Sequence, residues 1–292
     1  MKQTTIGQQA LDVLSLTKPR ISGLTLVTTF TGMFMAGAAV PAMGPMLLTL
    51  VGTALGVTSS CMLNNYVDRH LDRNMSRTAD RPLPDRRLPA GPVLETGILF
   101  GVLGVILVSV VSGIAAVLLA ISVLNYAVVY SLWMKRNSPY STELVGLSGA
   151  LAPVIGWTAV TGRVDLTALG LMSVLFFWQP AHFWTLGILY LDDYRKAKLP
   201  RYPVVHGRQQ TKNRMVIYNA LLVVASLALL LSAPVDVLYG SSVLLAGGLY
   251  LYWTTQYDPT TDQRSHHLFL FFSSIGYLLS LLLAVYMDLV LV

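Results

Sequence analysis

Residues 64–73 read Asn64-Asn65-Tyr66-Val67-Asp68-Arg69-His70-Leu71-Asp72-Arg73 and follow directly on an apolar segment over 46–66. On an α-helix, side chains four residues apart share a face, so this spacing aligns Asn64, Asp68 and Asp72. Two carboxylates placed in this way destabilise an isolated helix by roughly 0.2–0.5 kcal/mol. A hard divalent cation with oxygen ligands would offset the repulsion. The stretch therefore predicts a long apolar helix that ends in a metal site.

The residues after Asp68 are rich in arginine. Six of them lie between this aspartate and residue 87: Arg69, Arg73, Arg77, Arg81, Arg86 and Arg87. Guanidinium groups form paired hydrogen bonds with phosphate oxygens. Mg²⁺ commonly takes one or two carboxylates together with substrate phosphates. Acidic residues for the metal beside arginines for phosphate predict a site that handles a diphosphate.

The composition places this site in a membrane protein. Of the 292 residues, 54% are hydrophobic and 12% are charged, whereas soluble domains carry about 25% charged residues. The formal net charge of +6 is explained by basic cytoplasmic loops, so we expect no nucleic-acid partner. The single cysteine, Cys61, excludes an intramolecular disulfide and a cysteine-built metal site.

Hydropathy predicts the architecture. A membrane core of about 30 Å needs about 20 residues per helix. Nine segments meet this length, approximately 21–40, 46–66, 93–112, 115–133, 141–161, 166–191, 213–233, 235–253 and 268–290. We therefore predict an all-α membrane protein, a bundle of nine transmembrane helices in one domain over 1–292. Glycines at helical spacing, Gly52 with Gly56 and Gly97 with Gly101, predict close helix packing.

The basic residues predict the orientation. With a cytoplasmic N-terminus, only Arg163 of the twenty Lys and Arg falls on the opposite side. This asymmetry favours an N-terminus inside and a C-terminus outside. The first sixteen residues show neither the apolar core of a signal peptide nor the pattern of a transit peptide. We expect a multi-pass protein of a bacterial inner membrane.

Two long polar segments, 67–92 and 191–212, then lie on the cytoplasmic side. The second opens with Asp192-Asp193-Tyr194-Arg195-Lys196. Each segment begins with a tyrosine and acidic residues, continues with basic residues and prolines, and follows an even-numbered helix. We predict that the two acidic patches converge and hold Mg²⁺ on a diphosphate, with Asn64, Asp68, Asp72, Asp192 and Asp193 as ligands.

The spacing of Asn64, Asp68 and Asp72 resembles the first aspartate motif of the UbiA-type intramembrane prenyltransferases. The longer run is similar to the haem-farnesylating branch of that superfamily, the haem O synthases. The residues that carry this likeness extend from about Thr17 to Gly207. They are Asn64-Asn65-Tyr66-Val67-Asp68-Arg69, Asp72-Arg73, Arg77-Thr78, Arg81-Pro82-Leu83, Tyr130 to Arg136, Gly146 to Ala150, Pro153 to Trp157, Trp178 to Phe183, Asp192-Asp193-Tyr194 and Pro203-Val204-Val205.

This resemblance implies a UbiA-type fold and a reaction. Farnesyl diphosphate and haem b are the expected substrates, Mg²⁺ assists ionisation, and water supplies a new hydroxyl. The products are haem O and diphosphate, and the haem is destined for haem-copper terminal oxidases, so a haem A synthase or an oxidase is an expected partner beside membrane lipid. The resemblance implies that six residues contact the donor: Asn64, Arg77, Arg81, Lys135, Arg136 and Tyr194.

Some residues depart from the family pattern, and others have simpler explanations. Lys198 stands where a glycine is common, and Arg201-Tyr202 replace a usual Met-Leu. The aspartates could form ordinary ion pairs on a solvated loop. His182 is the one ionisable group well inside a span, where such groups usually have a purpose. It could bond a neighbouring helix, ligate haem iron or place a proton near the vinyl group, and we expect it to be catalytic beside Asp68 and Asp72.

Two other functions fit parts of the sequence. A prenyltransferase of the same superfamily could act on an aromatic quinone precursor. A transporter or a haem carrier belongs to a different class. Transporter sites typically lie near the bilayer midplane at broken helices. Here the carboxylates gather at one membrane face, which favours the enzyme.

Overall fold

The structure is a computed structural model, and it describes residues 5–37 and 40–291. These residues form helices and turns, with no strand among them. In chain order the elements are α1 (Ile6–Leu16), α2 (Pro19–Gly37), α3 (Met43–Asp68), η1 (Asp72–Asn74), α4 (Ala90–Ser109), α5 (Gly113–Leu124), η2 (Asn125–Met134), α6 (Lys135–Asn137), α7 (Ser141–Thr161), α8 (Leu166–Leu189), α9 (Leu191–Lys196), α10 (Tyr202–Ala228), η3 (Leu229–Leu231), α11 (Val237–Ser242), η4 (Val243–Gly247), α12 (Gly248–Gln256) and α13 (Arg264–Leu291). Of the η segments, η1 and η3 are 3₁₀ turns, and η2 and η4 are π-helical.

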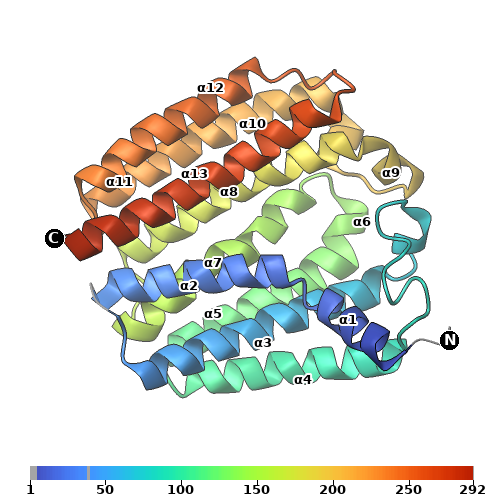
Figure 1. Ribbon diagram of the computed structural model, residues 1–292, viewed down its shortest axis with the longest axis horizontal. Helices are drawn as coiled ribbons and strands as arrows, with labels where there is room; N and C mark the ends of the chain where they lie inside the picture. Colours follow the sequence, from blue (N-terminus) through green and yellow to red (C-terminus); the bar gives the residue numbers. More distant parts are fainter. Residues whose placement is uncertain (1–4, 38–39, 292) are drawn as a thin grey trace.

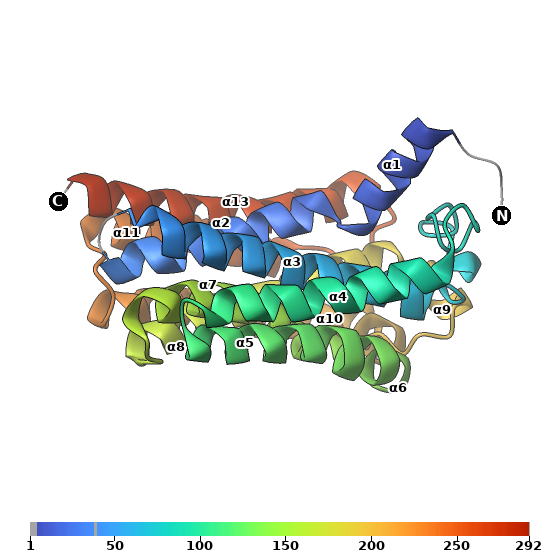
Figure 2. The same ribbon diagram turned by 90° about the horizontal axis from the view of Figure 1, so that it is seen from below.

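The long helices run alongside one another and form one bundle (Figures 1 and 2). α3 packs on α4, α7 packs on both α2 and α8, and α10 packs on α8. α1, the connection between α3 and α4, α6 and α9 gather at one end, whereas α11 and the end of α13 lie at the other (Figure 1). We name the first of these the polar end. The two polar segments, far apart in sequence, thus share one end of the bundle.

α2 and α7 approach until their backbones touch. A Cβ atom added to Gly32 would lie 2.0 Å from the carbonyl oxygen of Pro153, and one added to Gly156 would lie 1.9 Å from that of Thr29. Small residues at a crossing let membrane helices pack this closely. α7 is accordingly the most buried of the candidate spans, because 67% of its most apolar 18-residue stretch is buried.

α4 shows which surface suits lipid. Its buried residues include Gly101 and Gly104, and a Cβ atom on Gly104 would lie 2.6 Å from the carbonyl oxygen of Gly52 on α3. Its aliphatic side chains point the other way, and Ile98 and Leu99 each remain 53% exposed. A helix that buries glycine and exposes large apolar residues fits a lipid environment. The close packing predicted for these two helices is confirmed.

Seven helices of the described residues are long and apolar enough to span a membrane: Met43–Asp68, Ala90–Ser109, Gly113–Asn137, Ser141–Thr161, Leu166–Leu189, Tyr202–Leu231 and Arg264–Leu291. The all-α membrane class is confirmed, but the predicted count of nine is too high by two on this measure. The other two predicted spans, α2 and the run from α11 to α12, are helical and belong to the bundle. Their composition lowers the hydropathy, because α2 carries four threonines and the other run carries three tyrosines.

The polar segment 191–212, which we expected to connect two spans, is itself largely helical. α9 occupies its beginning, and α10 starts at Tyr202, well before the predicted start at 213. Pro203 fits the first turn of a helix. Gly207, with φ 82° and ψ 169°, then breaks the helical path, and its positive φ is a conformation that glycine adopts readily.

The N-terminal region also differs from expectation. α1 was not predicted, because its eleven residues are too few to register as a span. α2 begins at Pro19, close to the predicted start at 21. The last residues of the predicted segment 21–40 include positions 38–39, which lie outside the described residues.

Candidate functional site

The end of α3 forms the first half of the site. Asn64 and Asp68 are buried there, 4% and 0% exposed, and Nδ2 of Asn64 donates to Oδ2 of Asp68 over 2.7 Å. This contact confirms that the two residues share a helix face. Asp72 does not continue that face, because α3 ends at Asp68 and Asp72 begins the 3₁₀ turn η1. The prediction of three aligned side chains is therefore wrong for Asp72.

Asp72 instead organises the connection between α3 and α4. Its Oδ2 atom accepts from Nη1 of Arg81 over 2.7 Å, and its backbone carbonyl accepts from the hydroxyl of Thr78 over 3.1 Å. These contacts turn the chain back on itself after α3. The guanidinium of Arg81 offsets part of the repulsion that we expected between the two aspartates. Asp72 remains buried, 2% exposed.

A lysine from another helix compensates Asp68. Nζ of Lys135, itself 8% exposed, donates to Oδ2 of Asp68. The other oxygen, Oδ1, is buried and has no partner. Buried polar atoms nearly always have a partner. The unpartnered oxygen therefore fits a cation such as Mg²⁺, which usually takes one or two carboxylates from a protein.

Lys135 reaches Asp68 from the π-helical segment η2. The backbone N–H of Lys135 bonds to the carbonyl of Tyr130, five residues earlier, so these two side chains lie on one face. In the same segment, Oγ of Ser131 accepts from Nδ2 of Asn64 over 3.0 Å. π-helical turns are frequent at functional sites. Hydrophobic periodicity gives no signal for such a turn, and sequence reasoning missed it together with Ser131.

Two further cations contact the end of α3. Nη2 of the exposed Arg136 donates to the backbone carbonyl of Val67 over 3.1 Å. Nζ of Lys18, between α1 and α2, donates to Oδ1 of Asn64 over 3.1 Å. Burial lowers the pKa of Lys18. Sequence reasoning missed Lys18, because it lies 46 residues from Asn64 and a lysine before a span is expected for topology alone.

A hollow of about 410 Å³ lies between α1 and the connection that follows α3. Arg77, Arg81 and Arg87 line it together with Asp12. Arg87 binds Asp12 through two hydrogen bonds of 2.9 and 3.1 Å, which lower the pKa of the Asp12 carboxyl. The guanidinium of Arg77 lies 5.3 Å from the ring centre of Tyr190. The two arginines predicted to bind diphosphate thus share one recess.

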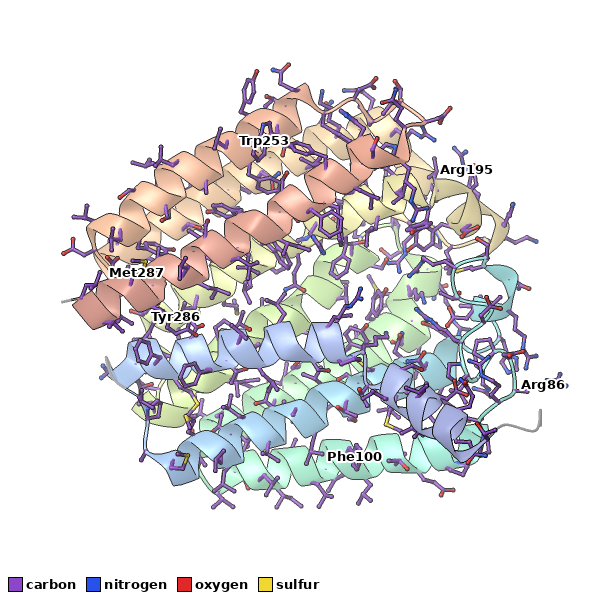
Figure 3. The ribbon with its side chains drawn as sticks, in the orientation of Figure 1. Arg86, Phe100, Arg195, Trp253, Tyr286 and Met287 are labelled. Atoms are coloured by element: carbon purple, nitrogen blue, oxygen red, sulfur yellow. The ribbon has the colours of Figure 1, made fainter. Side chains whose placement is uncertain are left out.

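The second acidic patch, in α9, is divided. The hydroxyl of Ser76 donates to the two carboxylate oxygens of Asp193 over 3.1 and 2.8 Å, which joins the two polar segments. Asp192 points to solvent, with a side chain that is 78% exposed and 3.3 Å from Nη1 of Arg195. Figure 3 shows Arg195 at the polar end, directed away from the bundle. The exposed position of Asp192 does not support the prediction that this residue is a metal ligand.

The predicted set of four acidic ligands does not assemble in the structure. Among the described residues, no group of three or more His, Cys, Asp or Glu side chains is placed to hold a metal ion. The oxygen ligands for a cation therefore come mainly from the first patch, where Asp68 has its unpartnered oxygen. Substrate phosphate oxygens would have to complete the coordination.

Arg201 links the second patch to the first. Its guanidinium lies 5.4 Å from the ring centre of Tyr194. Its Nη2 donates to the Tyr130 hydroxyl over 2.6 Å, and its Nη1 donates to Oγ of Ser141 over 3.1 Å. Tyr194, predicted to bind substrate, is thereby connected to the face that carries Lys135. Sequence reasoning recorded Arg201 only as a departure from the family pattern.

His182 belongs to α8, and its side chain contacts α13 inside the bundle. Its ring stacks on Trp178 and Phe271, with centroids 4.6 and 4.2 Å apart, and its Nδ1 atom lies 2.6 Å from the hydroxyl of Ser274. These contacts fix the ring in one orientation. Within the described part of the chain, none of them is with an acidic residue of the polar end.

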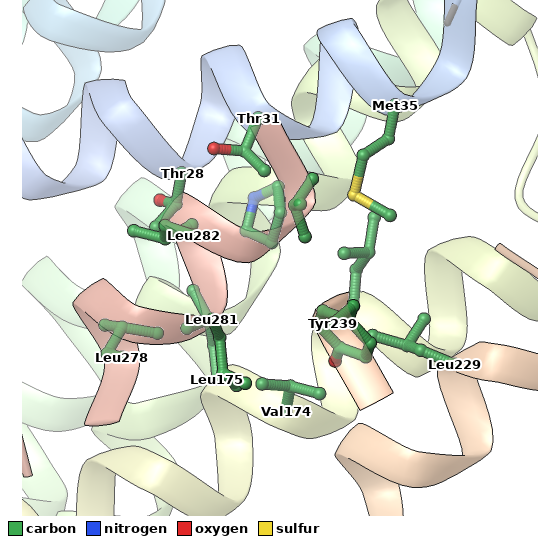
Figure 4. A pocket seen from close by; sticks show the side chains of 13 residues that line it. Thr28, Thr31, Met35, Val174, Leu175, Leu229, Tyr239, Leu278, Leu281 and Leu282 are labelled. Atoms are coloured by element: carbon green, nitrogen blue, oxygen red, sulfur yellow. The ribbon is translucent and has the colours of Figure 1, made fainter. Parts of the chain in front are cut away.

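A small apolar cavity of about 40 Å³ lies among α2, α8 and α13. Thr31 and Met35 line it from α2, Leu175 from α8 and Leu281 from α13 (Figure 4). Ligand pockets typically have volumes of about 300–1,000 Å³. The cavity is therefore a narrow apolar gap between packed helices, smaller than a typical ligand pocket. We name this gap the seam.

The sequence of this chain is similar to that of a known protein family. Residues 25–275 match the UbiA prenyltransferase family. The chain belongs to this family. Its relatives include the protoheme IX farnesyltransferase of Aquifex aeolicus (strain VF5), 37% identical over 286 residues with 97% of each chain covered. Another is the protoheme IX farnesyltransferase of Stutzerimonas stutzeri (strain A1501), 37% identical over 282 residues, which cover 95% of this chain and 93% of the relative.

Solved structures of the UbiA family share the bundle. A digeranylgeranylglyceryl phosphate synthase matches with a TM-score of 0.81, over 98% of this chain and 100% of that one, at 14% identity. A UbiA homologue from Archaeoglobus fulgidus bound to DMAPP and Mg²⁺ matches with a TM-score of 0.68, over 96% and 100%, also at 14% identity. These similarities confirm the UbiA fold. This UbiA chain is thus a multi-pass membrane prenyltransferase.

Proposed function

We propose that this protein transfers the farnesyl group of farnesyl diphosphate to a vinyl group of haem b, with addition of water, to give haem O and diphosphate. The observation that carries the proposal is the buried arrangement at the end of α3, where Asp68 keeps one unpartnered oxygen beside Lys135 and Asn64. Relatives named protoheme IX farnesyltransferase, 37% identical over almost the whole chain, support haem as the acceptor.

Asp68 and Asp72 are the proposed ligands of Mg²⁺, with Asn64 beside them and Asp193 approaching from α9. The unpartnered oxygen of Asp68 supports this assignment. When bound, Mg²⁺ supplies positive charge that stabilises the departing diphosphate. One or two carboxylates with phosphate oxygens are a usual set for this ion, so the site needs no larger acidic cluster. Asp192 has no role in this proposal, because it faces solvent.

Lys135, Arg77 and Arg81 are the proposed diphosphate contacts. Lys135 is already buried at Asp68, and the two arginines line the hollow beside α1. Hydrogen bonds between charged groups and phosphate oxygens are stronger than neutral ones. Together these cations draw negative charge from the carbon–oxygen bond that breaks. Arg136 and Tyr194 would contact the donor from the margins of the site.

The farnesyl tail would extend from the polar end into the apolar interior. The seam among α2, α8 and α13 offers apolar side chains along this path. Its volume of about 40 Å³ is too small for a long chain, so the side chains that line it would have to separate. Exclusion of water there would protect the allylic cation until the vinyl group attacks it.

His182 is the proposed catalytic residue on the acceptor side. Its fixed ring would ligate the haem iron or carry the proton that is released when water adds. Replacement of His182 by alanine should abolish product formation while the protein still binds farnesyl diphosphate. Full activity of His182→Ala would show that the residue only stabilises the contact between α8 and α13.

The polar end is proposed to face the cytoplasm of a bacterial cell, with the protein in the inner membrane and the C-terminus on the opposite side. The excess of Lys and Arg in the polar segments supports this orientation. The product would leave within the membrane toward a haem A synthase or a terminal oxidase.

An anaerobic assay tests the proposal. Purified protein in lipid is supplied with haem b, farnesyl diphosphate and Mg²⁺. The haem is then extracted, and its molecular mass is determined by mass spectrometry. Haem carrying one added farnesyl group and one added hydroxyl group, formed with an equal amount of diphosphate, is the expected product. Parallel reactions contain hydroxybenzoate or naphthoate acceptors. A prenylated quinone precursor, with unchanged haem, would assign the chain to the other branch of the UbiA family.

A further inference from the structure

Arg201 is a charged side chain without a counterion. It donates to two hydroxyl groups, those of Tyr130 and Ser141, and its Nε atom is buried with no partner. No carboxylate of the described residues forms an ion pair with it. Guanidinium stays protonated in proteins, and this half-buried one is surrounded by hydroxyl groups and the rings of Tyr130 and Tyr194 rather than by a paired carboxylate. Such an arrangement is suited to an anion that arrives from outside the chain.

The position of Arg201 indicates which anion this is. Tyr130, which accepts from its Nη2 atom, shares a face of η2 with Lys135, and Lys135 is paired with Asp68. On its other side the guanidinium lies 5.4 Å from the ring centre of Tyr194. Arg201 therefore reaches from the second polar segment to η2 and α7, on the side of the site where the donor's charged group is expected.

We propose that Arg201 binds the diphosphate of the prenyl donor. The inference rests on the proposed function and adds a contact to it. The free Nε–H and an Nη–H of a guanidinium can donate together to two oxygens of one phosphate group. Tyr130 and Ser141 hold the planar group in place before the ligand arrives, which lowers the entropic cost of binding.

The like charge of Lys135 does not prevent this arrangement. The two cations would repel one another if left alone, but the negative charges of the diphosphate and of the Asp68 carboxylate together balance both cations and a divalent metal ion. A haem carboxylate is the competing anion, and it would be expected to bind away from Lys135 and Asp68.

Equilibrium binding of inorganic diphosphate in the presence of Mg²⁺ tests the proposal on the full chain in lipid nanodiscs. Loss of one charged hydrogen-bonding group should weaken binding by about 10- to 100-fold in Arg201→Met. Arg201→Lys should recover part of the loss, because lysine keeps the positive charge but lacks the planar group that donates two parallel hydrogen bonds. Arg163→Met is the matched control, because Arg163 is exposed, pairs with Asp165 and lies outside the site; it should bind as the wild type does.

Steady-state kinetics separate binding from support of the fold. The KM for farnesyl diphosphate should rise in Arg201→Met by a similar factor, while the KM for haem b stays unchanged. Arg201→Gln, which can still bond to Tyr130, should show the same loss if Arg201→Met proves unstable. Diphosphate binding within twofold of wild type in these variants, or a rise in the KM for haem alone, would overturn the proposal. Wild-type protein that binds no diphosphate at all would instead refute the proposed function.

Discussion

Asp68 at the end of α3 and Asp193 in α9 lie at the same end of the bundle but in opposite surroundings. Asp68 is fully buried and held by an amide and an ammonium group. Asp193 is half-buried and held by the hydroxyl of one exposed serine. Both belong to segments with a similar order of acidic, basic and proline residues. Burial therefore distinguishes two patches whose composition is alike.

The difference assigns them different tasks. A side chain with several buried partners keeps its position before any ligand arrives, and such preorganisation favours catalysis. A side chain on a short helix with one exposed partner can shift at low cost. We infer that the first patch is the fixed part of the site and that the second adjusts to the ligand. The predictions below test this inference.

Replacement of the fixed carboxylate should have the largest effect. Asp68→Ala should lower turnover by about 10³-fold, because it removes the oxygen proposed for the metal and leaves the buried Lys135 unpaired. Turnover is measured as haem O formed by protein in lipid. Asp68→Asn, which keeps the size of the side chain, serves as the companion variant. Near-normal turnover in both would remove the basis for a metal site at the end of α3.

The second patch should respond unequally. Asp193→Ala should lower turnover by about 10- to 100-fold, as loss of a supporting contact near a metal typically does. Asp192→Ala is the matched control in the next residue, and it should stay within about threefold of wild type because exposed ion pairs contribute little. Measured KM values for farnesyl diphosphate would show whether the effect is on binding. Equal losses in the two variants would contradict the division that the structure shows.

The contact of α1 with the first polar segment should depend on pH. The bonds from Arg87 lower the pKa of Asp12, so the unfolded state takes up a proton at a higher pH than the folded state does. The stabilisation is therefore complete above the ordinary aspartate pKa of about 3.9 and is lost as the pH falls through the lowered pKa. The protection of the amides of 6–16, that is, their exchange rate corrected for the intrinsic pH dependence, should stay constant from pH 7 to 5 and fall only in stronger acid. Asp12→Asn should be less protected than wild type near neutral pH and should match it in strong acid.

The smallest expected effect concerns Lys198, which follows α9. Its φ of 53° is left-handed, a conformation that costs a residue with a side chain roughly 1–2 kcal/mol. Lys198→Gly should therefore raise the thermal unfolding midpoint slightly, by the equivalent of about 0.5–1 kcal/mol, without changing turnover. Lys198→Ala keeps the strain and should show no gain. A lower midpoint for the glycine variant would mean that the lysine side chain stabilises the second patch.

The sequence predicted the all-α class, most helix positions and the shared helix face of Asn64 and Asp68, because hydropathy and helical spacing act over short distances. It could not predict the partners of these residues. Lys18, Ser131 and Lys135 reach the end of α3 through packing of distant helices, which no local pattern encodes. Nor could it distinguish Asp192 from Asp193, since adjacent aspartates look equivalent until the turn of α9 directs one of them to solvent.

The unexpected winding of η2 has a consequence for tolerated change. In an α-helix each residue advances the chain by about 100°, and the wider π turn lets Tyr130 and Lys135 keep one direction although five residues separate them. If the segment 125–134 kept its length but were wound as an ordinary α-helix, five residues would rotate the chain by about 500°, so Lys135 would point roughly 140° away from Tyr130. Its ammonium group would then leave the carboxylate of Asp68, so this ion pair depends on how the segment is wound as well as on which residues it contains.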